Sequence, residues 1–283
     1  MLTRLLSNGF RLMILAAAFY AASDVGLKLL ASALPLAEIA FVRFLLGGIT
    51  LWPILFALKI SLKGQPLRFL ILRGVFGTAS FLCFIQSMSL IPLSLTMVLF
   101  YTFPIFAAFA SHLLLGERLH RREFGLIAIG LVGTYILINP GSHPFNRGYL
   151  YGLLAGVIGA LAMVTIRKAR ETNGPLIIYF YFCLVGGAVC SPFLLQNFRV
   201  PDYQQMGLLL GVGVSILVGQ ILMSQGFKFC RATEGSLFLM AELVFAGIAG
   251  IVFFKDPVTV RFGVGALLII GSGLGLNWMN RKT

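Results

Sequence analysis

The chain has 283 residues, of which 59% are hydrophobic and only 11% are charged. Its mean hydropathy of +0.96 leaves too few polar side chains to cover a water-exposed surface, which excludes a soluble globular protein. The formal net charge of +13 invites a nucleic-acid partner. The basic residues gather at alternate loops, however, and that pattern indicates membrane topology and argues against nucleic acid.

Apolar runs of roughly 18 to 23 residues recur along the whole chain, each long enough to cross a hydrocarbon core of about 30 Å as a helix. They predict an all-α polytopic membrane protein embedded in a lipid bilayer. We expect ten transmembrane helices, at residues 12–31, 36–58, 69–90, 93–115, 123–139, 148–168, 176–195, 205–228, 233–254 and 258–279.

The Lys and Arg residues sort by loop. Most of the 22 lie at one set of helix ends, and Arg73, at the start of the third helix, is counted with them. The opposite ends carry few: Lys28, Arg147, Arg199, Lys255 and Arg261. The positive-inside rule therefore places both termini in the cytoplasm. The expected location is the plasma membrane, in particular a bacterial inner membrane.

The second half of the chain repeats the first without a gap. Adding 139 to a position aligns several pairs: Phe41 with Phe180, Gly47-Gly48 with Gly186-Gly187, Pro53 with Pro192, Gly74 with Gly213, and Gln86 with Gln225. We expect repeat 1 at 12–139, an outer linker at 140–147 and repeat 2 at 148–279. Because each repeat has five helices, an odd number, the second is inverted in the membrane. Inverted repeats are typical of secondary transporters, with the substrate near the midplane between them.

The first two helices carry charges at intramembrane depth. Asp24 and Lys28 are four residues apart on one helix face, and Glu38 and Arg43 lie on the next helix. These four residues are candidates for two stacked ion pairs. Charges at this depth mark a functional site by default. A structural clasp on the outer gate is an equally open interpretation.

The third and fourth helices offer polar and aromatic candidates. Gln86 is the strongest on the third helix, since Gln225 matches it in the second repeat. Pro104 is expected to bend the fourth helix by removing a backbone hydrogen bond. Around it lie Phe100, Tyr101, Phe103, Phe106 and Phe109, which suit ligand stacking or, alternatively, contact with lipid or core. Tyr101 alone among them has a polar group.

The eighth and ninth helices add Gln220, Gln225 and Glu242. Glu242 stands near the middle of its span and is the deepest acid in the sequence. A charge at the bilayer centre costs at least ~2.5 to 3.5 kcal/mol on insertion scales, so such a residue is expected to face a cavity, a cation or a proton path. The structural alternative is a protonated or Arg43-paired acid that holds helices together.

The chain resembles the ten-helix branch of the drug/metabolite transporter superfamily, whose repeat is the EamA domain. The resemblance covers residues 12–278 and is carried by Arg43-Phe44-Leu45, Gly47-Gly48, Arg73-Gly74, Pro92-Leu93-Ser94, Tyr101 with Phe103-Pro104, and Leu115-Gly116-Glu117. It implies a central cavity surrounded by the first, third, fourth, sixth, eighth and ninth helices, supported by the fifth and tenth. Members carry amino acids, amines, nucleotide sugars, vitamins and other metabolites, outward or inward. Leu243 in place of Pro104, and Lys255-Asp256 in place of Gly116-Glu117, depart from the pattern and weaken the case for symmetric gating.

The sequence therefore predicts a secondary transporter of a small polar metabolite, with alternating access of one midplane site. A single central acid and little basic charge facing the cavity favour an amino acid, an amine or a related zwitterion or cation. Glu242 is expected to bind the ammonium group or exchange a coupling proton, with hydrogen bonds from Tyr101, Gln86, Gln225 and Gln220. The alternative cargo is an anionic metabolite such as a nucleotide sugar or sugar phosphate.

No cofactor or metal is expected, and the oligomeric state is monomer or homodimer. An intramembrane lipid-modifying enzyme is the rival class, but the sequence has no HExxH, GxSxG or P-loop motif.

Overall fold

The computed structural model describes residues 8–31, 33–91, 93–117, 120–138, 146–197, 201–254 and 260–279. The regular structure of these residues is helical. The helices are α1 (Asn8–Ala31), α2 (Leu36–Ala57), α3 (Leu67–Leu90), α4 (Leu93–Phe100), α5 (Phe103–Leu115), α6 (Arg121–Ile138), α7 (Arg147–Ala169), α8 (Pro175–Asn197), α9 (Tyr203–Gly226), α10 (Ala232–Leu239), α11 (Ala241–Phe254) and α12 (Val260–Met279).

The described residues of each of the ten predicted segments are mainly helical, but two segments are interrupted: 93–115 is divided into α4 and α5, and 233–254 into α10 and α11. Among the described residues, seven segments are long and apolar enough to cross a membrane, namely Asn8–Leu27, Glu38–Ala57, Leu67–Ser87, Arg147–Ala169, Pro175–Pro192, Tyr203–Gly226 and Ala232–Ala249. Two further apolar helical stretches, Phe103–Leu115 and Gly263–Gly275, are shorter. Pro92, Lys255-Asp256 and most of the expected linker lie outside the described residues.

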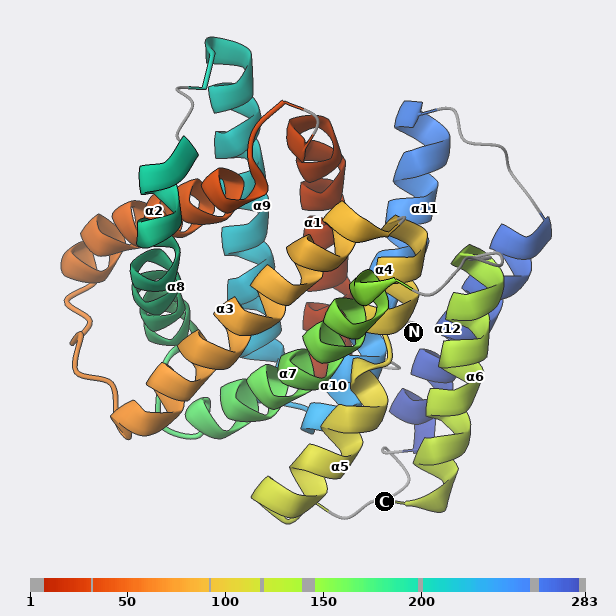
Figure 1. Cartoon of the computed structure of the whole chain (residues 1–283). Helices are drawn as coiled ribbons and strands as arrows, with labels where there is room; N and C mark the ends of the chain where they lie inside the picture. The colour runs from red at the N-terminus through yellow and green to blue at the C-terminus, as the bar shows by residue number, and fades with distance from the viewer. Residues whose placement is uncertain are drawn as a thin grey trace.

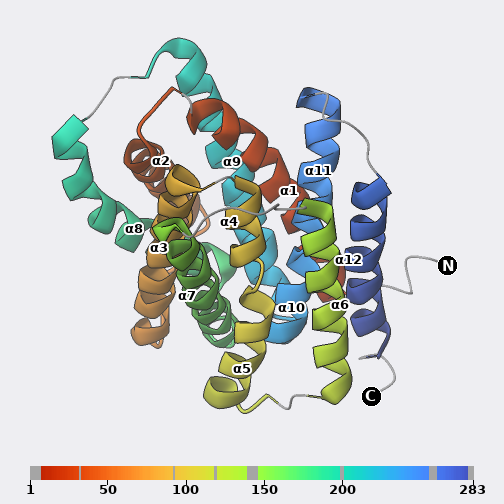
Figure 2. The same ribbon diagram turned by 45° about the vertical axis from the view of Figure 1, so that its right-hand side comes forward.

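The helices form a bundle whose two edges are pairs (Figures 1 and 2). Helices α6 and α12 lie side by side at one edge, and α2 and α8 lie at the opposite edge. Between the pairs, α3 packs along α7 and α1 packs along α9, while α11 packs against α1. The two interrupted segments lie between these long helices and the pair of α6 and α12.

Close approach of backbones holds the centre together. A Cβ atom added to Gly156 of α7 would lie 3.0 Å from the carbonyl oxygens of both Leu99 and Phe100, at the end of α4. Only glycine lets α7 reach this backbone, as small residues do in other membrane bundles. At the far end of α5, Gly116 takes φ 68 and ends the helix in the left-handed region that favours glycine.

The two interruptions fall at positions that correspond under the shift of 139 residues: Tyr101 follows α4 and Met240 follows α10. Both side chains are buried, with 1% and 0% exposure. Three-residue turns close the gaps, since the Met240 amide donates to the Leu237 carbonyl at 3.2 Å and the Thr102 amide to the Leu99 carbonyl at 3.2 Å. The expected bend at Pro104 is thus a break just before it, with the proline in the first turn of α5, where its missing N–H costs nothing.

The turns that carry most of the basic residues meet at one end of the bundle, called here the basic end. Asn173, after α7, accepts the Gln65 amide at 2.9 Å, and the Tyr181 hydroxyl donates to the Leu62 carbonyl at 3.0 Å, which joins the α2–α3 and α7–α8 turns. Arg170 adds a bond from Nε to the Ser224 carbonyl at 2.9 Å and so attaches α7 to α9. These contacts gather the basic turns onto one face.

Candidate functional site

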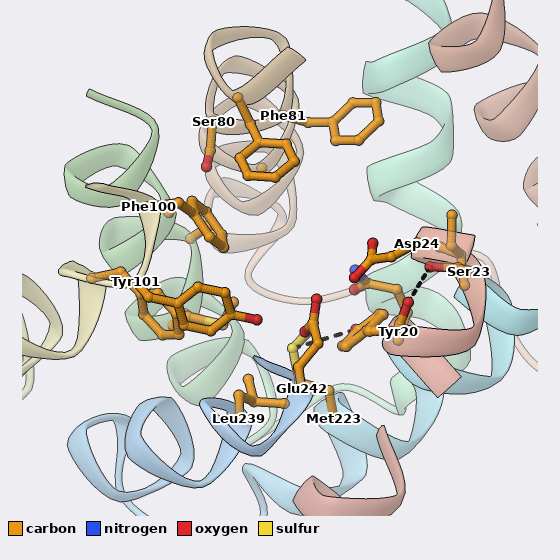
Figure 3. A pocket seen from close by; sticks show the side chains of 18 of the residues that line it. Tyr20, Ser23, Asp24, Ser80, Phe81, Phe100, Tyr101, Met223, Leu239 and Glu242 are labelled. Atoms are coloured by element: carbon orange, nitrogen blue, oxygen red, sulfur yellow. Dashed lines mark hydrogen bonds between the residues drawn. The ribbon is translucent and has the colours of Figure 1, made fainter. Parts of the chain in front are cut away.

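A cavity of about 160 Å³ lies at the centre of the bundle, where α1, α3, α9 and the two interrupted segments converge (Figure 3). Its polar lining residues come from six different parts of the fold: Tyr20, Ser23, Asp24, Arg43, Arg73, Ser80, Tyr101, Gln220 and Glu242. The rest of the wall is apolar and includes five phenylalanine side chains: Phe81, Phe84, Phe100, Phe103 and Phe182. An apolar pocket with a few convergent polar groups is the usual form of a small-molecule site.

Glu242 is placed by the second interruption. It is the second residue of α11 and lies in its first turn, where the free N–H groups of a helix favour negative charge. The Tyr101 hydroxyl, from the first interruption, points toward the Glu242 carboxyl group (Figure 3). Asp24 of α1 and Tyr101 are the main electrostatic neighbours of that carboxyl group. The two interruptions therefore bring together an acid and a phenol that their sequence positions separate by more than half the chain.

Among the described residues, two buried polar atoms of this group, Asp24 Oδ2 and Tyr101 Oη, make no hydrogen bond of ordinary geometry. Both residues line the cavity. Since buried polar atoms are nearly always hydrogen-bonded, partnerless atoms that face a cavity mark a place for a polar ligand.

Basic charge also faces the cavity, which corrects the expectation that little would. Arg73 was counted with the residues at the basic end, yet α3 begins at Leu67, and Arg73 is 3% exposed and lines the cavity. Its Nη2 donates to Oε1 of Gln220 at 3.0 Å. Arg43 lines the cavity too, and among the described residues it has no carboxylate within 4 Å, so it forms no ion pair with Asp24 or Glu38 in this arrangement.

The aromatic residues around Pro104 divide between the two expected environments. Phe100, Tyr101 and Phe103 line the cavity, and their rings lie 5.4 to 5.6 Å apart. Phe109, by contrast, is 52% exposed on the outside of α5. The first three make an aromatic wall next to Glu242, of the kind that contacts apolar or cationic ligand groups.

The other predicted site residues are dispersed. Gln220 lines the cavity, but Gln86 is exposed and is not part of the lining. Gln225 accepts a hydrogen bond from Arg170 Nη2 at 2.7 Å near the basic end. Glu38 is buried in the first turn of α2 and is not part of the described lining, and the structure does not describe the side chain of Lys28.

Tyr20, Ser23 and Arg73 line the cavity but were not predicted to do so, and their positions follow the helical period of the lining. On α1 the lining positions are 20, 23, 24 and 27, and on α3 they are 73, 77, 80, 81 and 84. These spacings of three and four mark one face of a helix. Starting from Asp24, the same period leads back to Tyr20 and Ser23, and on α3 Arg73 begins the polar and aromatic face that includes Ser80.

The basic end is closed by an ionic cluster. Arg167 of α7 lies 3.7 Å from Glu117, and the Glu117 carboxylate accepts the Ala232 amide at 3.3 Å. Arg231, which precedes α10, pairs with Glu234 at 2.5 Å and also with Glu123 of α6. The cluster ties four helix ends together. The cavity lining instead reaches Leu27 and Met97, each about one turn from the opposite end of its helix.

The cluster predicts a pH dependence of stability. Burial raises the pKa of Glu117 above its ordinary value of 4.5, and Arg167 opposes part of the rise. The folded protein thus holds the Glu117 proton to a higher pH than the unfolded chain does. The stability that this proton contributes to the fold is complete below the unfolded-state pKa and is lost as the pH rises through the folded-state pKa. We expect the Tm of wild type minus that of Glu117→Gln, measured in detergent, to fall as the pH rises from 4.5 toward neutrality. A difference that grows with pH would mean that the Arg167 ion pair outweighs burial.

Fold and site together define a multi-pass helical membrane protein with a central cavity of mixed charge. The sequence model of the EamA-like transporter family matches the chain twice, at residues 7–139 and 146–278. The chain belongs to this family. It is therefore a membrane transporter of the drug/metabolite type and not an enzyme, as the resemblance implied.

Named relatives span nearly the whole chain. The chain is 29% identical over 273 residues to the pseudopaline exporter CntI of Pseudomonas aeruginosa, which covers 95% of this chain and 96% of that protein. It is 25% identical over 280 residues to the S-adenosylmethionine uptake transporter of Rickettsia prowazekii, covering 98% of this chain and 94% of that one. A solved crystal structure of a protein with 18% identity superposes with a TM-score of 0.83 over 97% of this chain and 98% of that chain, which shows a shared fold.

Proposed function

We propose that this protein is a secondary transporter that moves a small amino acid, amine or related zwitterion by alternating the access of its central cavity. The observation that carries the proposal is the placement of Glu242 at the interruption of α10 and α11, facing the cavity with Asp24 and Tyr101. An ammonium group between two carboxyl groups relieves their repulsion, and a proton does the same when the cargo is absent. The proton is accordingly our candidate for the coupling ion.

We further propose ten membrane crossings arranged as two inverted five-helix repeats, 12–139 and 148–279, joined by an outer linker at 140–147. The packing supports it. In such an arrangement α1 of repeat 1 corresponds to α7 of repeat 2, and α3 corresponds to α9. The contact of α1 with α9 should then be matched by a contact of α7 with α3, and both contacts occur. The matched interruptions at Tyr101 and Met240 support it as well. Discontinuous helices at the centre are a common device for substrate sites in transporters with inverted repeats.

The basic end is our candidate for the cytoplasmic side of a plasma membrane, with the two termini on that side. Gly9, near the start of α1, packs against Phe229 and Cys230 of the turn before α10, which puts the start of α1 at the basic end. In this orientation the ionic cluster closes the inner side, and the cavity extends toward the outer side. The CntI relative is named an exporter and the Rickettsia relative an uptake transporter, so relatives leave the direction open.

The size of the cavity favours a cargo no larger than an amino acid. Its volume of about 160 Å³ is close to that of an engineered 150 Å³ protein cavity that binds benzene. A nucleotide sugar is several times larger. A specific observation does favour an anionic cargo, namely the two arginines Arg43 and Arg73 in the lining. A small sugar phosphate is therefore kept as the second candidate.

The test is transport by the purified protein in liposomes. Uptake of each of the twenty amino acids and a panel of primary amines is measured with and without an inward pH gradient, against protein-free liposomes. We expect saturable uptake of at least one of these solutes that responds to the gradient. If only sugar phosphates or nucleotide sugars enter, the anionic alternative replaces the proposal, and if no solute of either class enters, both fail.

A further inference from the structure

Two guanidinium groups face the cavity, and neither has a carboxylate partner in the part of the chain that the structure describes. Arg43 of α2 is 7% exposed and Arg73 of α3 is 3% exposed, and both line the cavity. Within the described residues, neither has an acidic side chain within 4 Å. Buried charges in proteins are normally paired, because an unpaired charge in a medium of low dielectric is costly.

Aromatic rings hold both groups instead. The Arg73 guanidinium carbon lies 3.9 Å from the centre of the Phe182 ring, and that of Arg43 lies 4.1 Å from the centre of the Phe81 ring. Arg43 is also within 5.2 Å of the Phe44 ring centre and 5.7 Å of the Phe182 ring centre. A cation over a ring face is stabilised by the ring quadrupole, and two stacked rings fix the plane of the guanidinium group.

Stacking occupies the faces of a guanidinium group and leaves its donors at the edge. Arg73 directs one of its donors to Gln220 at 3.0 Å. Arg43 Nε is buried and has no hydrogen-bond partner among the residues that the structure describes. Its edge is therefore a preformed donor at the wall of the cavity, and a planar carboxylate is the acceptor that fits such a fork in a bidentate manner.

The acids of the cavity belong to other helices. Asp24 lies on α1 and Glu242 at the start of α11, whereas the arginines lie on α2 and α3. In the part of the chain that the structure describes, Asp24 Oδ2 and Tyr101 Oη are, like Arg43 Nε, buried without a hydrogen bond of ordinary geometry. The wall thus offers hydrogen-bond donors and positive charge on one set of helices, and negative charge on another.

From this arrangement we propose that Arg43, supported by Arg73, binds a carboxylate of the cargo, while Asp24 and Glu242 bind its ammonium group. The cargo is then a zwitterion of amino-acid size, and neither a simple amine nor a simple acid satisfies the cavity. This inference rests on the proposed transport function and narrows its substrate class. It also gives Arg43 a direct part in selectivity, in place of a structural clasp with Asp24.

The test compares four related solutes that differ only in charged groups: leucine, 3-methylbutylamine without the carboxylate, 4-methylpentanoate without the amine, and leucinamide with a neutral amide. Kd is measured by thermal shift and by competition with transport in liposomes. The same set is built on whichever amino acid gives the largest uptake in the panel. We expect the amino acid to bind at least about tenfold more tightly than each of the other three.

Arg43→Gln and Arg43→Lys identify the residue responsible. We expect Arg43→Gln to weaken the affinity for the amino acid at least about tenfold and to leave the affinity for the amine unchanged. The preference for the amino acid over the amine should then disappear. Arg43→Lys retains the charge without the fork and is expected to recover only part of the preference. Arg68→Gln is the matched control, since Arg68 stacks at 4.8 Å on Phe69 and does not line the cavity. Size-exclusion profiles and the Tm without solute verify folding.

The outcomes separate this inference from the function on which it rests. Equal affinity of wild type for the amino acid and the amine, or an unchanged preference in folded Arg43→Gln, overturns the carboxylate site but leaves the transporter standing. If no amino acid or amine binds, both proposals fall. If the acid without an amine binds as tightly as the amino acid, Arg43 holds an anion and the ammonium half of the inference is wrong.

Discussion

Replacing Glu242 by glutamine is expected to reduce the initial rate of amino-acid transport in liposomes about 10- to 100-fold. Glutamine keeps the size of the side chain but loses the charge, and a hydrogen bond to a charged group contributes about 1.5 to 3 kcal/mol, which corresponds to that range. The solute-dependent rise in Tm should disappear with it. The dependence of the remaining transport on the pH gradient should also weaken, because the exchangeable proton on Glu242 is gone.

The Tm of the Glu242→Gln protein without solute distinguishes a role of Glu242 in transport from a structural role. A charge at the bilayer centre costs at least ~2.5 to 3.5 kcal/mol, so removing an acid that serves only transport should leave the Tm without solute unchanged or higher. An acid that holds helices together would give a lower Tm. Glu171→Gln is the matched control, because its ion pair with Lys168 at 2.8 Å is exposed and surface pairs contribute little. Unchanged transport by a folded Glu242→Gln protein would remove Glu242 from the site.

The helices could be predicted from the sequence because apolar runs report directly on burial in lipid. The interruptions could be predicted only in part. Pro104 signals the break between α4 and α5, since proline cannot donate a backbone hydrogen bond. The break between α10 and α11 has Leu243 at the matching position and no local signal. The second break could be predicted only by applying the shift of 139 residues to the first. That prediction assumes that both repeats break their helices at the same position even where their residues differ.

The site was harder to predict because polarity does not specify which face of a helix a residue occupies. Gln86 comes two residues after Phe84, which lines the cavity, and two residues turn a helix by about 200°. It therefore lies on the opposite side of α3. Arg73 was misplaced for a related reason. Counting basic residues at helix ends supposes that each meets water, whereas α3 starts at Leu67 and carries Arg73 inward to Gln220 and Phe182.

Replacing Gly156 by leucine is expected to destabilise the protein by about 3 kcal/mol or more, or to prevent its folding. Even a Cβ atom there would lie 3.0 Å from two backbone carbonyl oxygens, of Leu99 and Phe100, and 3.1 Å from Thr102 Oγ1. Backbone atoms cannot move aside as flexible side chains do. The larger side chain must push α7 away from the end of α4 and so displace Tyr101, which follows directly.

The matched control for this change is Gly211→Leu on α9, where an added Cβ meets no other atom within 4 Å. This variant should keep the wild-type Tm, because it adds an apolar side chain to an exposed helix position. Gly156→Ala should fall between the two, with a lower Tm and reduced transport in the protein that folds. We would measure the Tm and the monodisperse fraction recovered from detergent. A Gly156→Leu protein with wild-type stability and transport would mean that α7 does not position the interruption at Tyr101, and the link between helix packing and the site would fail.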